Sequence, residues 1–209
     1  MSVGILDYGS GNLLSVKNAL EFLGASPVVC DSPESVATSS QIIIPGVGSF
    51  HDCIRAIRNR KLDSALNDAR QRNIPILGIC MGMQVMATQG HEGGDVKGLG
   101  WFDADVIRLN PSDRTLSVPQ VGWSEIKIKQ NHPVLQGIAP QTDFYFVHSY
   151  YMQCTNPSDI SAICLYGSEI PCAVAMNSVF AVQFHPEKSQ DNGLKLLENF
   201  LKWDGNYHG

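Results

Sequence analysis

The feature that most constrains this chain is the alternation, in its first half, of short apolar runs with segments of helical periodicity. The apolar runs lie at residues 3–6, 27–30, 41–44 and 76–79. Apolar residues recur at helical spacing over residues 13–23, and the spacing over residues 54–69 predicts one or two further helices. Strands that alternate with helices form parallel sheets, and near-continuous apolar strands indicate a sheet that is covered on both faces.

The second half, after about residue 101, has a different pattern. Strand-like runs follow one another closely at residues 105–109, 125–129, 144–147, 163–166 and 179–184. Few helical segments separate them, which favours antiparallel strands. A last helix is predicted over residues 193–202. The predicted fold class is therefore α/β, with a mainly parallel central sheet flanked by helices and an antiparallel β addition in the C-terminal half.

Composition narrows the classes of function. With 209 residues, of which 44% are hydrophobic, the chain can bury one substantial core, and no linker divides it, so we expect a single domain over residues 1–209. The net charge is −5 without a basic stripe, which argues against a nucleic-acid partner. No apolar run reaches the roughly 18 residues that span a bilayer. No signal peptide is evident at residues 1–7, so we expect a cytoplasmic protein with no membrane partner.

The cysteines do not suggest a metal site. The chain has six cysteines, and no two of them have C-x-x-C spacing, so neither a zinc site nor a redox pair is predicted. Without a secretory signal, reduced thiols are expected, most of them as small buried hydrophobic residues. One cysteine, Cys80, lies in a context that packing alone does not explain.

The segment around Cys80 has the pattern of a nucleophile elbow. The apolar run at residues 76–79 leads directly into Gly-Ile-Cys-Met-Gly-Met-Gln at residues 78–84, and an apolar helix is expected to follow. Glycines two residues before and after a nucleophile relieve crowding in the sharp turn between strand and helix. The beginning of a helix favours a thiolate and offers backbone N–H donors. The alternative is a buried structural cysteine with two incidental glycines.

A cysteine nucleophile needs a base, and the base needs an acceptor that orients it. His185 follows the apolar run at residues 179–182, so it is expected at the rim of the sheet, and Pro186 stiffens its turn. Glu187 is close enough in sequence to accept from the second imidazole nitrogen. The alternative for His185 is a surface or capping histidine.

Two glycine-containing segments follow other strands. Pro-Gly-Val-Gly at residues 45–48 can present backbone N–H groups to an oxyanion, although it is also compatible with an ordinary turn. The Asp-Tyr-Gly-Ser-Gly-Asn segment at residues 7–12 raises the possibility of a dinucleotide site. The G-x-G-x-x-G pattern would require glycine at position 14, where the chain has Leu14, so NAD binding is not expected.

Taken in order, these motifs resemble the class I, or triad, glutamine amidotransferases. The segments at residues 7–12, 45–50, 78–84, 146–150 and 185–189 are together similar to the glutaminase subunits of imidazole glycerol phosphate synthases. The resemblance implies Cys80 as nucleophile, His185 as acid/base and Glu187 as orienting carboxylate. It assigns the oxyanion hole to the N–H groups of Val47 and Met81. The residues that it places in the glutamine pocket are Gly46, Gly48, Gln84, Glu92, Ser149 and Tyr150.

The resemblance also implies a reaction and a partner. Glutamine is hydrolysed to glutamate and ammonia without a metal or an organic cofactor. The ammonia passes to a separate (β/α)₈-barrel subunit, the lyase component of a heterodimer in histidine biosynthesis. The residues that belong to the face toward this partner are Asn12, Gln120, Trp123 and Lys188. The Pro45 to Gly48 segment is expected to turn the Val47 N–H away from the substrate until the partner binds.

One segment departs from the family pattern. Many members carry Pro-His-Met-Gly-Trp-Asn where this chain has Pro-Gln-Val-Gly-Trp-Ser at residues 119–124. The departure lies near the expected partner face and leaves a paralogous subunit, one that supplies ammonia for amidino-sugar synthesis in surface polysaccharides, as an alternative. A non-catalytic α/β binding module is a second alternative, against which the intact Cys80, His185 and Glu187 argue. A peptidase-like cysteine hydrolase is a third, although it should lack the His-Pro-Glu-Lys-Ser segment.

Overall fold

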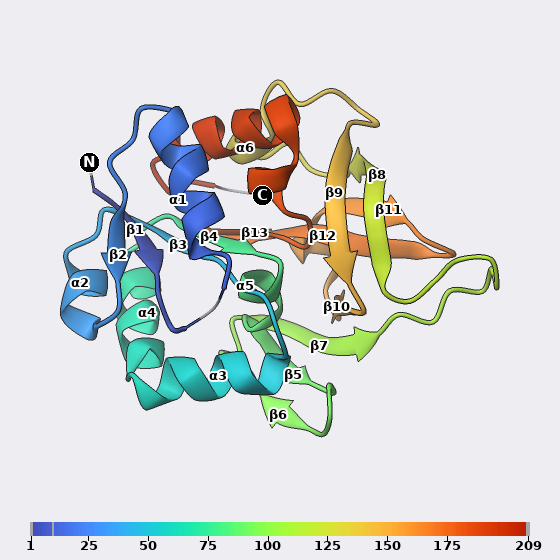
Figure 1. Ribbon diagram of the computed structural model, residues 1–209, viewed down its shortest axis with the longest axis horizontal. Coiled ribbons are helices and arrows are strands. Elements are labelled where there is room, and N and C mark those ends of the chain that lie inside the picture. Colours follow the sequence, from blue (N-terminus) through green and yellow to red (C-terminus); the bar gives the residue numbers. More distant parts are fainter. Residues whose placement is uncertain (1, 10, 208–209) are drawn as a thin grey trace.

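The computed structural model describes residues 2–9 and 11–207 and has two sheets (Figure 1). The nine-stranded sheet has the order β2-β1-β3-β4-β13-β12-β11-β8-β9. Its strands are β1 (Val3–Leu6), β2 (Val28–Cys30), β3 (Gln41–Ile44), β4 (Ile76–Ile79), β8 (Gln120–Ile128), β9 (Asp143–His148), β11 (Ile160–Leu165), β12 (Glu169–Met176) and β13 (Val179–Val182). The first five in spatial order pair in parallel and the remaining pairs are antiparallel. The predicted fold class is confirmed.

Helices cover both faces of this sheet. The α-helices are α1 (Leu13–Phe22), α2 (Pro33–Ala37), α3 (Phe50–Asn59), α4 (Leu62–Gln71), α5 (Met81–Gln84) and α6 (Gln190–Lys202). Short 3₁₀ turns lie at η1 (Pro133–Leu135), η2 (Pro157–Asp159) and η3 (Pro186–Lys188). In Figure 1, α1 and α6 lie on one side of the sheet, and α3 and α4 lie on the other. No helix in the described part of the chain is long and apolar enough to cross a membrane.

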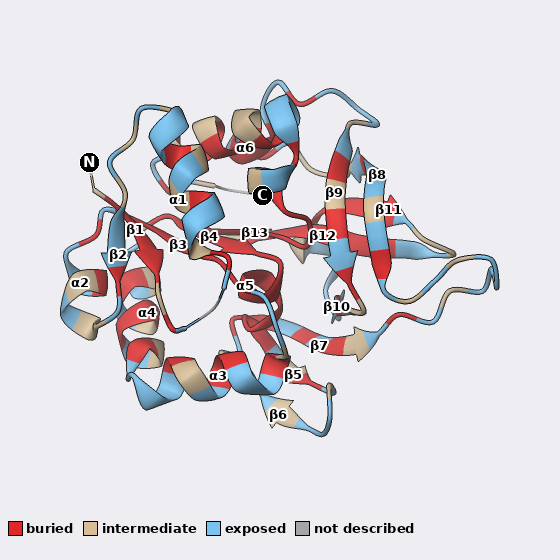
Figure 2. Ribbon diagram, in the orientation of Figure 1, coloured by how far each residue is buried: buried red, intermediate tan, exposed pale blue. Residues whose placement is uncertain are grey.

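The central strands are apolar throughout because they are buried on both faces. Successive side chains of a strand point to opposite faces, and β3 illustrates this: Ile43 packs into the core beneath α1 and α6. Ile42 and Ile44 pack into the core beneath α3 and α4. Figure 2 shows β3 and β4 buried along their length, whereas β8 and β9 keep exposed positions.

The second sheet was not predicted. Its four strands have the order β10-β7-β5-β6 and comprise β5 (Ala87–Gly90), β6 (Val96–Lys97), β7 (Phe102–Arg108) and β10 (Tyr150–Cys154). Only β7 was expected as a strand. The apolar helix expected after Cys80 is present as α5, which is a single turn that leads into β5. Met83, Val85 and Met86 are fully buried, and an apolar run that is buried all round has no periodicity that separates helix from strand.

Candidate active site

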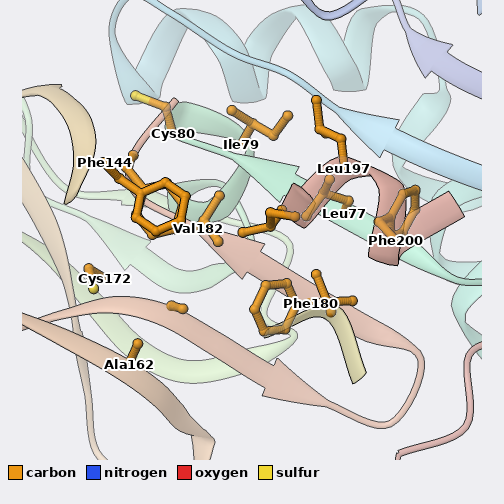
Figure 3. Packing of buried hydrophobic residues seen from close by; sticks show 14 of the residues in the cluster. Leu77, Ile79, Cys80, Phe144, Ala162, Cys172, Phe180, Val182, Leu197 and Phe200 are labelled. Atoms are coloured by element: carbon orange, nitrogen blue, oxygen red, sulfur yellow. The ribbon is translucent and has the colours of Figure 1, made fainter. Parts of the chain in front are cut away.

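Cys80 lies in a sharp turn between β4 and α5, as the elbow pattern predicts. Its backbone has φ 54° and ψ −109°, outside the favoured regions for a residue with a side chain. The turn packs against β3 so closely that a Cβ on Gly82 would lie 1.7 Å from the Ile44 carbonyl oxygen. A Cβ on Gly78 would lie 2.9 Å from the Gly82 carbonyl oxygen. Both glycines are therefore required by close approach of the backbone. Figure 3 shows the Cys80 sulfur at the edge of the buried cluster, directed away from Leu77.

The second half of the chain brings a histidine and a carboxylate to this sulfur. Nδ1 of His185 lies 2.7 Å from Oε1 of Glu187, and both side chains are almost fully buried. The η3 turn holds the two residues together, and the Ser189 hydroxyl donates to the His185 carbonyl at 2.7 Å. Cys80 interacts with the same imidazole, and Cys80 and His185 line one cavity. Cys80, His185 and Glu187 therefore form a linked triad.

The charge state of His185 is set by these partners. Burial opposes the imidazolium, but the hydrogen bonds and negative charges of Cys80 and Glu187 outweigh it and raise the pKa of His185 to about 9. A cationic imidazole stabilises a thiolate beside it and has a proton ready to give.

Two residues that the sequence did not assign to the triad also contact it. Nδ2 of Asn12 donates to Oε1 of Glu187 at 2.5 Å and lies 3.4 Å from Nδ1 of His185. Nε2 of Gln183 donates to the Cys80 sulfur at 3.7 Å. Gln183 lies two residues before His185, and an amide at the buried end of an apolar strand was the available signal for it.

The two backbone groups expected in the oxyanion hole lie side by side, although not in a donating arrangement. The Met81 N–H donates to the Gly46 carbonyl oxygen at 3.3 Å. The C=O and N–H of a trans peptide point in opposite directions, so the N–H of Val47 points away from Met81. Gly46 is confined, because a Cβ there would lie 2.4 Å from the Tyr8 hydroxyl and 2.7 Å from the Met81 Cβ.

A cavity of about 320 Å³ opens beside the triad. Most of the residues expected to bind glutamine line it: Gly48, Gln84, Glu92, Ser149 and Tyr150. Val47, Met81, Cys80 and His185 line it as well. Nε2 of Gln84 donates to the Tyr150 carbonyl at 2.8 Å, and Oε2 of Glu92 accepts from the Phe50 N–H at 2.8 Å. The volume suits a small metabolite.

The four residues expected on the partner face divide into two pairs. Trp123 is 46% exposed, and Lys188 is exposed at the mouth of the cavity. Asn12 and Gln120 are buried at 5% and 2% exposure and hydrogen-bond within the chain. Their amides satisfy buried partners, which leaves little of either side chain at the surface. The Ser10 position of the residue 7–12 motif lies outside the described residues.

Within residues 2–9 and 11–207, the remaining histidines and cysteines do not form a second site of this kind. His132 packs against Phe180 and Trp203, and burial lowers its pKa to about 3. Burial raises the pKa of Cys53 to about 11 and that of Cys154 to about 12. Among residues 2–9 and 11–207, no group of three His, Cys, Asp or Glu side chains is arranged to hold a metal ion.

Comparison with known families agrees with this geometry. The model of the class I glutamine amidotransferase family matches residues 4–203. The match covers nearly the whole chain and includes the elbow, the cavity and the His185 turn. The chain belongs to the class I glutamine amidotransferase family.

Several curated relatives are HisH subunits of imidazole glycerol phosphate synthases. The chain is 41% identical over 208 residues to the imidazole glycerol phosphate synthase subunit HisH 2 of Nitrobacter winogradskyi, with 97% of this chain and 98% of the relative covered. It is 42% identical over 215 residues to the subunit HisH of Brucella abortus, with 97% and 99% covered. For the HisH subunit of Ruegeria pomeroyi, identity is 41% over 210 residues, with 97% and 99% covered.

Solved structures share the fold at lower identity. The structure of PurLQS from Thermotoga maritima superposes with a TM-score of 0.75 at 19% identity, covering 96% of this chain and 97% of that one. A crystal structure of a glutamine amidotransferase gives a TM-score of 0.73 at 20% identity, again covering 96% and 97%.

Proposed function

We propose that this chain is the glutaminase subunit of an imidazole glycerol phosphate synthase and supplies ammonia for histidine biosynthesis. The observation that carries the proposal is the linked triad of Cys80, His185 and Glu187, of which Cys80 and His185 line a small cavity. Near full-length identity of about 41% to subunits of this name supports the particular pathway.

The chemistry starts at the Cys80 sulfur. The thiolate attacks the side-chain amide carbon of glutamine, and a tetrahedral oxyanion forms. His185 gives its proton to the amide nitrogen, which leaves as ammonia, and a glutamyl thioester remains on Cys80. The neutral imidazole then takes a proton from water, which attacks the thioester and releases glutamate. Glu187 keeps the imidazole oriented and stabilises its cation in both steps.

The cavity offers groups that suit glutamine. Oε1 of Gln84 is buried and has no hydrogen-bond partner among the described residues, so it is available to accept from a substrate N–H. Glu92 supplies negative charge at the cavity wall, which suits the substrate ammonium group. Gly48, Ser149 and Tyr150 complete the wall.

The oxyanion hole requires one peptide to turn over. In the conformation described, the Met81 N–H donates to the Gly46 carbonyl oxygen and is therefore not available to an oxyanion. If the Gly46–Val47 peptide flips, the N–H groups of Val47 and Met81 converge on one point and can hold the oxyanion together. Lack of one such donor costs about 10²–10³ in turnover. The orientation of the Gly46–Val47 peptide therefore controls the glutaminase activity, and a partner that favours the flipped orientation would raise it.

A (β/α)₈-barrel subunit is the partner that we infer, and the exposed apolar side chains beside the cavity mouth support its docking there. Val121 of β8 pairs with Val147 of β9, and both are exposed at 58% and 37%. Trp123 lies on the same strand, and Lys188 adds a positive charge at the mouth. Gln120 is buried and contacts Ser124 of β8 and His148 of β9, whereas Asn12 contacts His185 and Glu187 of the triad. Ammonia released at Cys80 would pass to the partner across this face.

Co-expression with the barrel subunit tests this proposal. The complex should convert glutamine to glutamate and make imidazole glycerol phosphate in a glutamine-dependent reaction. A complex with the Cys80→Ala variant should use added ammonium salts but not glutamine. Glutaminase activity without product from the histidine-pathway acceptor would reassign the chain to another synthase.

A further inference from the structure

A line of buried hydrogen bonds begins behind the exposed face of β8. Gln120 of β8 lies between two side chains: its amide is 3.1 Å from Nε2 of His148 and 3.0 Å from the hydroxyl oxygen of Ser124. Nδ1 of His148 lies 2.9 Å from the Tyr150 carbonyl oxygen. Gln120 and His148 are 2% and 6% exposed, so water does not substitute for these contacts.

The line continues to the Cys80 sulfur. The Tyr150 carbonyl also accepts from Nε2 of Gln84 at 2.8 Å, and the same nitrogen donates to Oε1 of Gln183 at 2.9 Å. Nε2 of Gln183 then donates to the Cys80 sulfur at 3.7 Å. Gln84 and Gln183 are both buried. A chain of hydrogen bonds therefore joins Ser124 on β8 to the triad through the wall of the cavity.

The direction of the bonds is fixed by the backbone. A carbonyl oxygen only accepts, so Nδ1 of His148 must carry a proton toward Tyr150. Burial lowers the pKa of His148 to about 4, and the nearby charge of His185 adds to this effect. The hydrogen bond to the Tyr150 carbonyl acts in the opposite direction but is weaker, so the ring is neutral. Nε2 of His148 is then a bare acceptor that requires a donor from Gln120.

This requirement determines how the Gln120 amide is turned. With Oε1 toward His148, a lone pair of the neutral ring would face the amide oxygen at 3.1 Å. With the amide turned over, its NH₂ group donates to His148 and its oxygen accepts from the Ser124 hydroxyl. The two ends of an amide have nearly the same shape, so the donor–acceptor pattern decides between them. Each member of the chain then has a partner.

We propose that Gln120 is a positioning residue for the substrate pocket, and that with Ser124 and His148 it forms a one-directional hydrogen-bond chain. The chain holds the Tyr150 carbonyl and, through it, the Gln84 amide. Gln120 and Ser124 are also the two polar positions at which residues 119–124 depart from the family pattern, and in this structure they contact each other. The two departures therefore act as one unit. The proposal rests on the proposed function, because Gln84 and Tyr150 line the cavity assigned to glutamine.

The first test is the tautomer of His148 in the full chain, measured by ¹⁵N NMR of the imidazole nitrogens. The proposal predicts a neutral ring with its proton on Nδ1 from pH 6 to pH 8. A proton on Nε2, or a ring protonated at both nitrogens, would overturn the proposed direction of the chain. This measurement does not depend on any activity of the protein.

The second test separates binding from chemistry. Gln120→Met removes the donor to His148 and lets the pocket wall move, so KM for glutamine should rise about 5- to 10-fold while kcat changes less than about twofold. Ser124→Ala, which removes a bond one step further from the wall, should raise KM less. The double variant should not exceed Gln120→Met, because the residues act in one chain. Gln153→Met, an exposed glutamine on β10, is the matched control and should leave both constants unchanged.

The outcomes distinguish this inference from the proposed function. If the wild-type chain hydrolyses no glutamine with its partner present, the proposed function fails, and the His148 tautomer alone decides the inference. If the wild type is active and Gln120→Met binds glutamine as tightly as the control, the inference is wrong. Should Gln120→Met fail to fold, the test passes to Ser124→Ala, and an unchanged KM in that variant would count against the proposal.

Discussion

The two walls of the active site are held in place by different means. On the wall that carries Cys80, backbone lies against backbone: Gly82 contacts Ile44 and Gly46 contacts Met81 so closely that neither glycine has room for a Cβ. On the wall that carries His185, side-chain hydrogen bonds join residues far apart in sequence, as between Asn12 and Glu187. Close backbone packing fixes the first wall, and hydrogen bonds between buried polar groups fix the second. We therefore expect substitutions in the first wall to lower stability and substitutions in the second wall to lower turnover.

The largest effect is expected at the nucleophile. Cys80→Ala should lower glutamine hydrolysis by about 10⁴-fold or more while leaving the fold intact, because no other group replaces the thiolate. Electrophilic glutamine analogues should alkylate Cys80 in the wild type, and mass spectrometry locates the label. A label on Cys30 or Cys164 instead would mean that the site is misassigned.

His185→Asn tests the polar wall. Turnover should fall about 10³–10⁴-fold, because the imidazole moves a proton in both half-reactions. Glu187→Gln should cost less, since the carboxylate orients the ring rather than transferring the proton. The exposed His51→Asn serves as the control. Equal steady-state rates for the wild type and the His185 variant would eliminate the triad.

Gly82→Ala tests the steric wall. The added Cβ would lie 1.7 Å from the Ile44 carbonyl oxygen, so the elbow must move, and a loss of about 3 kcal/mol or more in the free energy of unfolding is expected. In Gly11→Ala the new Cβ meets nothing closer than Val47 at 3.6 Å, and stability should change by less than about 1 kcal/mol. Chemical denaturation measures both variants. Equal free energies of unfolding for the Gly82→Ala and Gly11→Ala variants would show that close backbone packing does not fix the position of this wall.

The pH dependence of stability tests the charged pair. The folded pKa of His185, about 9, lies above the ordinary value of 6.5, so the folded state binds its proton more tightly. This contribution, on the order of 3 kcal/mol, is present in full below pH 6.5 and is lost as the pH rises through 9. NMR titration of the full chain should give a raised pKa that falls in Cys80→Ala, where one of its hydrogen bonds is missing. A pKa near 6.5 in the wild type contradicts this account.

These two walls also differ in how far the sequence predicted them. The elbow was recognisable because its glycines and apolar strand lie within a few consecutive residues, where local sterics act. The strands β1, β3 and β4 were predictable for the same reason. Asn12 and Gln183 were missed as contacts of the triad because long-range hydrogen bonds leave no local pattern. The second sheet was missed because its four strands come from separate parts of the chain. The apolar residues just before β5 are also buried on all sides, so they show no strand periodicity.

The most direct test of the account is glutamine hydrolysis measured for the chain alone, with the barrel partner, and with the partner and an acceptor analogue. The Gly46 carbonyl occupies the Met81 N–H in the chain alone, so one donor to the oxyanion is missing. We predict that turnover alone is about 10²–10³-fold below that of the fully assembled complex. The partner shifts the peptide equilibrium only by the difference between its affinities for the flipped and unflipped states. An acceptor analogue that also favours the flipped state should therefore raise turnover further. Full activity in the chain alone would contradict the account and favour an independent hydrolase.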